Sequence, residues 1–317
     1  MVAACRGWVT CVQLLLECGA SVDLCTVQPE PCTETVGTAG SDNNGFDLKL
    51  WDEDHSLAGF GSPLSACIPR VRADDTVMAL IRVLLSYGAN VDCRGGQVGS
   101  PLGAAISAKR FEAASVLLTA GADISLEDTE GRNIALKMAV SYEDGGEGLR
   151  WLFERGAYAG PMVLNAYLHM AAEGYQEEIV WQLIDHGADP HSTDVHGRNA
   201  LHNIAEGHRR WPRDVSRKLP RIDDRVAMAE TLLDLGVDIN AVGGEYNTVL
   251  IAASVSSDPD LVRLFLFRGA DIHHSSDEYG TALEAAGTVS GGEHHDAILD
   301  MLSIAVADDS SLSISIA

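Results

Sequence analysis

A glycine that follows a short apolar run recurs along the chain. The pattern reads LLLECGASVD, LLSYGANVD, LLTAGADIS, LFERGAYAG, LIDHGADPH, LLDLGVDIN and LFRGADIH. Its glycines are Gly19, Gly88, Gly121, Gly156, Gly187, Gly236 and Gly269. Between them lies an Ala-rich piece, written GSPLSAC, GSPLGAAI, NIALKMA, NAYLHMAA, NALHNIA, NTVLIAAS and GTALEAA. Two alternating motifs of this kind predict a repeat array, in which each unit buries its apolar face against its neighbours.

The spacing of the two motifs defines the length of the unit. Where the pattern is undisturbed, 19 residues lead from the Ala-rich piece to the glycine and 14 lead on to the next piece, so the unit has 33 residues. Extra chain is confined to a few places: about 31 residues after Gly19, five in the second repeat and 16 in the sixth. The positions taken as equivalent are Leu64, Leu102, Ala135, Leu168, Leu201, Leu250 and Leu283.

Elementary helix chemistry explains the unit. Ser, Thr or Asn before the Ala-rich piece predicts an N-cap, and Pro is tolerated in the first turn that follows. Alanine pairs keep this first helix thin, so that neighbouring units can approach closely. The second helix carries apolar residues at helical spacing, such as Val180, Leu183 and Ile184. The glycine then predicts a left-handed helix cap.

The pattern resembles the ankyrin repeat family, whose consensus reads T-P-L-H-x-A-A followed by I-V-x-L-L-L-x-x-G-A-D-V-N. The closest segments are NALHNIAEGH, YLHMAAEGYQEEIVWQLIDHGADP and LVRLFLFRGADIH. The variants GGEYNTVLIAAS, DEYGTALEAAG and GSPLGAAI are similar to the form common in fungal ankyrin proteins. The resemblance implies an all-α ankyrin-repeat solenoid of about seven to eight helix-turn-helix units with hairpin loops.

The resemblance also divides the chain. Residues 1–25 are expected to be a partial first repeat, 26–60 a flexible hairpin insertion, and 61–302 repeats two to eight, with a basic insertion at 206–222 in repeat six. Residues 303–317 are expected to be a C-terminal cap or tail, because Leu302 stands where the last glycine is expected. The fourth unit loses its Asp and shortens its hairpin at Ala157–Pro161.

Charge and cysteine content restrict the class of protein. The formal net charge of -24 and the pI near 4.6 disfavour direct binding to nucleic acid or to an anionic membrane. The seven cysteines are odd in number and form no C-x-x-C, which indicates reduced thiols in a cytoplasmic or nuclear protein. The apolar start of the chain is interpreted as an amphipathic helix rather than a secretory leader, and no membrane span is expected. The chain is expected to be a monomer.

In the ankyrin family the hairpin tips and first helices form a concave face that binds protein partners. The resemblance carries this role onto hairpin positions that are rich in acid, with Tyr or His between them, and implies a partner with a basic segment. The alternative interpretation is that these are polar, solvated turns. The positions are Glu127, Asp128, Glu130, Asp194, His196, Glu245, Tyr246, Asp277, Glu278 and Tyr279.

The stretch GHRRWPRDVSRKLP is a basic island in an acidic chain. Its excess length sits between the two helices of the sixth unit, which in the family is the end away from the hairpins. Pro212 and Pro220 exclude one continuous helix, and Asp223 or Asp224 is expected to cap the next one. The island is interpreted as a solvated loop or as a secondary docking or nuclear-localisation patch, carried by Arg209, Arg210, Trp211, Arg213, Arg217 and Lys218.

Motifs of catalysis are missing from the sequence: it contains no G-x-S-x-G, Walker A, G-x-G-x-x-G or H-E-x-x-H. His169 and His202 occupy the T-P-L-H slot, where a structural hydrogen bond is the ordinary role. We therefore predict a non-enzymatic interaction scaffold without cofactor, metal or catalytic residues, with a transcriptional coregulator or an accessory protein of a fungal biosynthetic pathway as special cases. The alternative is an isomerase or cyclase whose concave pocket is roofed by the 26–60 insertion and lined by Trp51 and His55.

Overall fold

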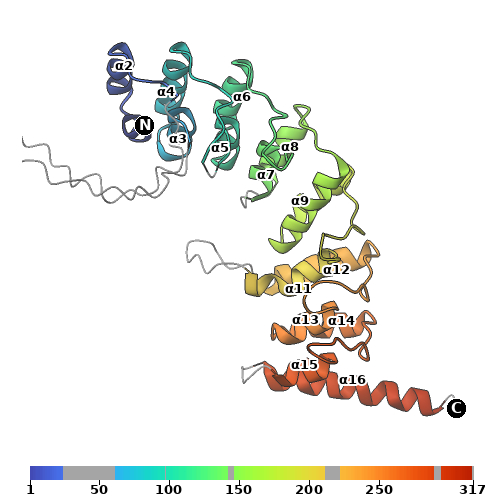
Figure 1. Ribbon diagram of the computed structural model, residues 1–317. Coiled ribbons are helices and arrows are strands. Elements are labelled where there is room, and N and C mark those ends of the chain that lie inside the picture. The colour runs from blue at the N-terminus through green and yellow to red at the C-terminus, as the bar shows by residue number, and fades with distance from the viewer. Residues whose placement is uncertain (24–60, 97, 142–145, 211–221, 289–293, 316–317) are drawn as a thin grey trace, which may run out of the picture. The chain divides into compact units, whose positions relative to one another are not determined.

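The fold is all-helical. The computed structural model describes residues 1–23, 61–96, 98–141, 146–210, 222–288 and 294–315. These residues form sixteen helices and no β-strand, apart from two isolated bridges (Figure 1). The chain divides into two compact units, Met1–Ala159 and Gly160–Ala317, with eight helices each. The predicted all-α solenoid of seven to eight helix pairs is confirmed.

Unit 1 is a stack of helix pairs. The first helices α1, α3, α5 and α7 pack on one another in chain order, and α2, α4 and α6 pack beside them in a second layer (Figure 1). The helices of unit 1 are α1 Val2–Cys5, α2 Val9–Glu17, α3 Pro63–Arg70, α4 Asp74–Ser86, α5 Pro101–Ser107, α6 Phe111–Thr119, α7 Ile134–Ser141 and α8 Glu147–Phe153.

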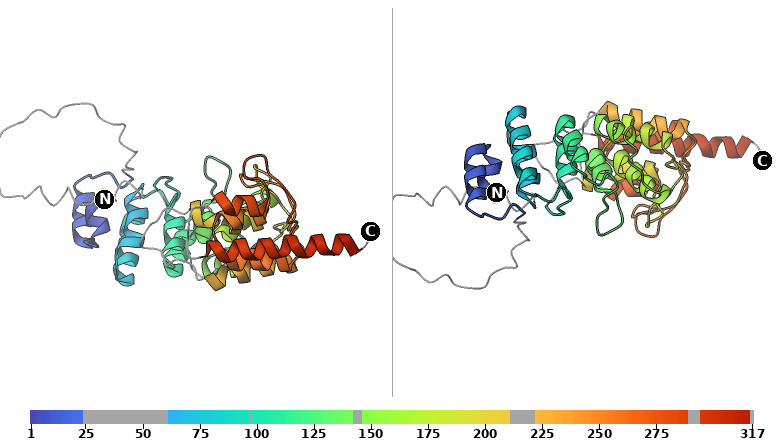
Figure 2. Two further views of the ribbon diagram at one scale, coloured as in Figure 1. Left: turned by 90° about the horizontal axis from the view of Figure 1, so that it is seen from below. Right: turned by 90° about the horizontal axis from the view of Figure 1, so that it is seen from above.

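Unit 2 repeats this plan. One layer is formed by α9, α11, α13 and α15, and a second layer contains α12, α14 and α16. The last helix, α16, extends past its neighbours (Figure 2). The helices of unit 2 are α9 Pro161–Glu173, α10 Glu177–Asp185, α11 Ala200–Arg210, α12 Ile222–Asp234, α13 Val249–Val255, α14 Pro259–Phe267, α15 Ala282–Thr288 and α16 His295–Ser315.

The predicted caps are present at most of the Ala-rich helices, and Asn165 is an exception because it lies inside α9. The side-chain oxygens of Ser62, Ser100 and Thr248 each accept the backbone N–H three residues further on, at 3.1, 3.0 and 3.3 Å. The Ala-Ala pairs of the first helices are buried, for example Ala104–Ala105 and Ala252–Ala253. All seven repeat glycines adopt the left-handed conformation, with φ from 81° to 101°. Local capping chemistry therefore sets both ends of the helix pair.

The segments that follow the repeat glycines also join neighbouring repeats within each unit. The side chain of Asp23 accepts the backbone N–H of Asn90 at 2.8 Å, and that of Asp92 accepts the N–H of Asp123 at 2.9 Å. In unit 2 the amide oxygen of Asn240 accepts the N–H of Asp271 at 2.8 Å. Several Asp and Asn side chains therefore bind backbone groups that would otherwise lack a partner at the turn.

Three helix boundaries differ from the sequence-based expectation. Helix α12 begins at Ile222, so Asp223 and Asp224 lie in its first turn and the predicted cap at either position is wrong. Carboxylates in a first turn still interact favourably with the helix dipole. Helix α9 begins at Pro161, ahead of Asn165, which the repeat predicts as its cap, because Pro at the first helical position presets the backbone. Helix α16 continues through the buried Leu302 to Ser315.

Candidate functional site

The unit 1 hairpin holds the first three candidate residues. A β-bridge joins Glu127 to Asn133 across the turn. The carboxylate of Asp128 accepts the backbone N–H groups of Glu130 and Arg132 at 2.9 and 3.0 Å. It also accepts Arg132 Nε and Lys137 Nζ, both at 3.1 Å. Asp128 is therefore a structural residue of the turn, with two cations of its own.

The surroundings of Asp128 lower its pKa. Partial burial acts to raise it, but the two backbone hydrogen bonds and those from Lys137 and Arg132 outweigh burial and lower the pKa to about 2. Glu127 and Glu130 are exposed, and Glu130 pairs with Arg132 at 2.9 Å. Of the three candidates in unit 1, the two glutamates are exposed and Asp128 is half-buried.

The same geometry recurs in unit 2, at Asp194. Its carboxylate accepts the N–H groups of His196 and Arg198 at 2.8 and 3.0 Å, and Arg198 Nη2 lies 2.6 Å from Oδ2. Arg198 Nη1 also contacts Glu206 Oε2 at 2.9 Å. The sequences DTEGRN and DVHGRN share the pattern D-x-x-G-R-N. This pattern is the sequence signal that identifies both aspartates as turn residues.

Three consecutive hairpins of unit 2, residues 194–198, 242–247 and 276–280, form what we call the unit 2 hairpin strip (Figure 1). His196 O accepts the backbone N–H of Gly244 at 3.0 Å. The hydroxyl of Tyr279 donates to Glu245 Oε1 at 3.1 Å. The rings of Tyr246 and Tyr279 lie 5.0 Å apart. The strip therefore brings together candidate residues that are far apart in sequence.

The candidate residues of the strip differ in exposure. Tyr246 is buried and supports Tyr279, so the interpretation of Tyr246 as a contact residue is not supported by its position. Partial burial and the Glu245 carboxylate raise the pKa of Tyr279 to about 12. Exposed side chains are those of His196, Glu245, Asp277 and Glu278. No ion pair within the described residues joins Glu245, Asp277 or Glu278 to a cation.

Sequence reasoning missed two valines on the strip. Val195 is 94% exposed and Val242 is 55% exposed. Val195 follows Asp194 in a turn closed by the hydrogen bond from Gly197 N–H to Asp194 O. Gly, Asn, Asp and Ser are the usual residues of such turns, so a valine there is the signal that could have revealed the site.

The basic island is described only at its start. Arg209 and Arg210 belong to helix α11, and Trp211, Arg213, Arg217 and Lys218 lie outside the described residues. Because α11 begins at Ala200, directly after the hairpin, Arg210 lies a helix length, about 15 Å, from the hairpin end of α11. The 26–60 insertion, with Trp51 and His55, also lies outside the described residues.

The two T-P-L-H histidines are buried and hydrogen-bonded. Asn203 Nδ2 lies 2.9 Å from His169 Nδ1, and Asn199 Oδ1 lies 2.7 Å from His202 Nδ1. Burial lowers the pKa of both histidines. Each ring therefore makes the structural hydrogen bond that its position in the motif predicts. Among the described residues, no cluster of three or more His, Cys, Asp or Glu is arranged to hold a metal ion.

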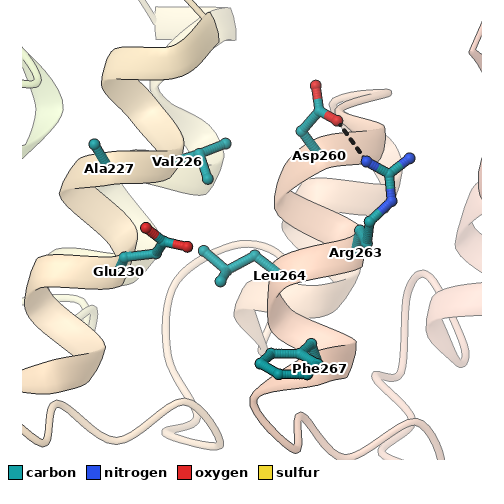
Figure 3. Close-up of a pocket in the computed structure, with 7 residues that line it drawn as sticks. All are labelled: Val226, Ala227, Glu230, Asp260, Arg263, Leu264 and Phe267. Carbon is teal, nitrogen blue, oxygen red and sulfur yellow. Dashed lines mark hydrogen bonds and ion pairs between the residues drawn. The ribbon is translucent and has the colours of Figure 1, made fainter.

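An open groove lies elsewhere in unit 2, between the second-layer helices α12 and α14 (Figure 3). Leu264 and the 85% exposed Phe267 line it from α14, and Asp260 pairs with Arg263 at its rim. The groove has a volume of about 530 Å³ and contains none of the candidate residues. Within the described parts of the chain, no helix is both long and apolar enough to cross a bilayer.

Comparison with known proteins agrees with the observed fold. The sequence profile of the ankyrin repeat family matches residues 1–27 and 165–195. Human Ankyrin repeat and SOCS box protein 6 is 29% identical over 150 residues, which cover 44% of this chain and 32% of that protein. The mouse protein of the same name is 31% identical over 110 residues, covering 34% and 23%. The chain thus matches a third or less of the length of these relatives.

A solved structure of the ankyrin repeat domain of Bcl-3 superposes with a TM-score of 0.51 at 23% identity, covering 75% of this chain and 98% of that domain. This likeness concerns the fold. The 33-residue repeat, the stacked helix pairs and the left-handed glycine caps agree with this fold. The chain carries ankyrin repeats and has the fold of an ankyrin repeat domain.

Proposed function

We propose that this chain is a protein-interaction scaffold whose acidic hairpins bind a basic segment of a protein partner. Ankyrin repeats indicate a protein–protein interaction scaffold. The observation that supports the finer proposal is the difference between two kinds of acid. Asp128 and Asp194 are held by cations of their own hairpin, whereas Glu245, Asp277 and Glu278 face solvent. Carboxylates of the second kind attract a basic partner.

The unit 2 hairpin strip is suited to binding because hydrogen bonds join its three hairpins. The hydrogen bond from Gly244 to His196 and that from Tyr279 to Glu245 connect all three hairpins. A surface that is already ordered loses less conformational entropy when a partner binds. The partner contacts we propose are Glu127 and Glu130 in unit 1, and His196, Glu245, Asp277, Glu278 and Tyr279 in unit 2.

Charge reversal tests the proposal. The full chain is labelled and its binding is measured on an array of extended heptapeptides in three sets, rich in Lys and Arg, in Asp and Glu, or in Ser and Gln. We expect retention of the basic set and at least tenfold weaker binding by the triple variant Glu245→Lys, Asp277→Lys and Glu278→Lys. Raised salt is expected to weaken the wild-type interaction, because these charges are exposed.

A matched control distinguishes the effect of the strip on binding from the effect of the overall net charge of -24. The variant Asp185→Lys, Glu230→Lys and Asp300→Lys changes three exposed acids on second helices of unit 2. It should retain the basic peptides. Equal losses in both triple variants, or no retention of basic peptides by wild type, would contradict the proposal. Glu127→Lys with Glu130→Lys tests unit 1 separately, and Asp128 is left intact because its loss would disturb the turn.

The more specific form of the proposal places a monomeric chain in the nucleus, as a transcriptional coregulator or an accessory protein of a fungal biosynthetic pathway. Its support is the acidic hairpin surface, which suits a basic transcription factor, together with the basic island at 206–222. Imaging compares wild type with a variant in which the island is neutralised, and an unchanged distribution removes the localisation role. The substituted residues are Arg209, Arg210, Arg213, Arg217 and Lys218.

A further inference from the structure

The unit 2 hairpin strip carries an apolar feature that charge does not explain. Val195 is 94% exposed and Val242 is 55% exposed, on two adjoining hairpins. Single exposed apolar residues are normal on a protein surface. Here two β-branched side chains are exposed on adjoining hairpins, and Val195 stands in a turn, where Gly, Asn, Asp and Ser are the usual residues. The two valines therefore define two candidate contact points.

The backbones below these valines are in direct contact. Gly244 N–H donates to His196 O at 3.0 Å, and a Cβ at Gly243 would lie only 2.1 Å from Gly197 O. Only glycine allows this approach. Counting 3.8 Å per residue from the hydrogen-bonded pair, the Cα atoms of Val195 and Val242 lie at most about 16 Å apart. An extended segment of about five residues spans that distance.

Acids lie on the same strip. Glu245 comes three residues after Val242, and its Oε1 is held by the Tyr279 hydroxyl. Asp277 and Glu278 precede Tyr279 on the next hairpin and are exposed. The acid nearest to Val195 in sequence, Asp194, is neutralised by Arg198. The strip thus has an exposed valine on its first and second hairpins and exposed acids on its second and third.

We infer that Val195 and Val242 are two apolar contact points for aliphatic side chains of an extended basic segment, while the acids of the strip bind its Lys or Arg residues. The inference rests on the proposed function and adds the side chain that the partner must present. Burying an aliphatic side chain against exposed valines favours binding by about tenfold. Charge complementarity alone would accept any basic segment, so the valines supply the selectivity.

The test uses the basic heptapeptides described above, with the second and sixth positions varied together through Leu, Ile, Val, Ser, Gln and Asp. Wild type is expected to bind the aliphatic peptides about tenfold more tightly than the Ser and Gln peptides. The variant Val195→Ser with Val242→Ser should lose this preference and still bind basic peptides. Phe267→Ser is the matched control, because Phe267 is 85% exposed in the same unit but lies on α14, away from the strip.

The outcomes separate the two proposals. An aliphatic preference that is absent in wild type, or that persists in the valine double variant, overturns the inference while the charge proposal stands. Loss of the preference in Phe267→Ser also overturns it, because the preference would then arise elsewhere. If wild type retains no basic peptide, the proposed function fails as well. Circular dichroism of the valine variant checks the fold, and no change is expected for side chains this exposed.

Discussion

Arg198 Nη2 lies 2.6 Å from Asp194 Oδ2, and the other terminal nitrogen of the same guanidinium lies 2.9 Å from Glu206 Oε2. The side chains of Arg198 and Glu206 are 11% and 7% exposed. One arginine therefore ties the hairpin to the first helix of the next repeat, α11. Removing one partner of an ion pair this sheltered from water costs more stability than removing one partner of an exposed pair.

Replacing Arg198 by Ala is expected to lower the free energy of unfolding by about 3 kcal/mol, because Asp194 and Glu206 lose the cation between them. Urea denaturation followed by circular dichroism measures the change. Arg263→Ala is the control: Arg263 pairs with Asp260 but is 67% exposed, so its loss should cost under about 0.5 kcal/mol. Similar losses in the two variants would refute a structural role for the Arg198 cluster.

Replacing Asn240 by Ala removes the hydrogen bond from Asp271 N–H to Asn240 Oδ1 that joins two repeats. The expected cost is about 1 kcal/mol, the usual net value of such a bond. Asp277→Ala changes an exposed residue on a nearby hairpin and should be close to neutral. Hydrogen exchange provides a second measurement, in which the amide of Asp271 should lose protection. Unchanged protection there would show that the bond does not hold the repeats together.

The stability of unit 2 is expected to fall as the pH drops below about 6.5. Burial lowers the pKa of His169 below the ordinary value of 6.5, and its Nδ1 faces the amide nitrogen of Asn203. The unfolded chain therefore takes up a proton at a higher pH than the folded one, which favours unfolding as acid is added. Hairpin carboxylates of unit 2 with a lowered pKa, such as Asp194, act only below about pH 4.

His169→Gln removes one of the titrating groups. Its stability, measured by urea titration at several values between pH 5 and pH 7.5, should vary less with pH than that of wild type. The two curves should approach each other toward the acid end. Parallel curves for wild type and variant across this range would show that His169 contributes nothing to the pH dependence.

Two helical glycines are expected to respond to alanine in opposite directions. A Cβ at Gly103 in α5 would lie 2.3 Å from Val98 O and 3.1 Å from Met138 Cγ, so Gly103→Ala should destabilise the protein by about 2 kcal/mol. A Cβ at Gly287 in α15 would meet no neighbouring atom of the described residues within 4 Å, and Gly287→Ala should add about 0.5 kcal/mol through helix propensity. Thermal melting of both variants measures the two signs.

Much of the architecture follows from local chemistry. The seven glycines that the repeat predicts as helix caps all have positive φ, and Ser62, Ser100 and Thr248 cap the helices that they precede. Caps act within one turn, so sequence spacing reveals them. The boundaries that differ are the starts of α12 and α9 and the end of α16. They lie where an insertion or a departure from the repeat removes that local signal.

The candidate site was less predictable. Its acidic hairpins were located by the repeat, but acidity alone did not distinguish Asp194, which an arginine neutralises, from Glu278, which faces solvent. Tyr246 and Tyr279 have the same sequence character, yet Tyr246 is buried and Tyr279 holds Glu245. Exposure depends on what the neighbouring hairpin places nearby, which lies 30 or more residues away in the chain.

By itself, the amino-acid sequence determined the length of the repeat, the two helices of each unit and the left-handed turn that ends them, because these depend on residues within a few positions of one another. Only the tertiary structure decided which hairpin acids are held by cations, which side chains join the hairpins of the strip, and that Val195 and Val242 face solvent on adjoining hairpins. Those properties arise from stacking one repeat against the next. Stacking places residues of different units in contact, and no local pattern records it.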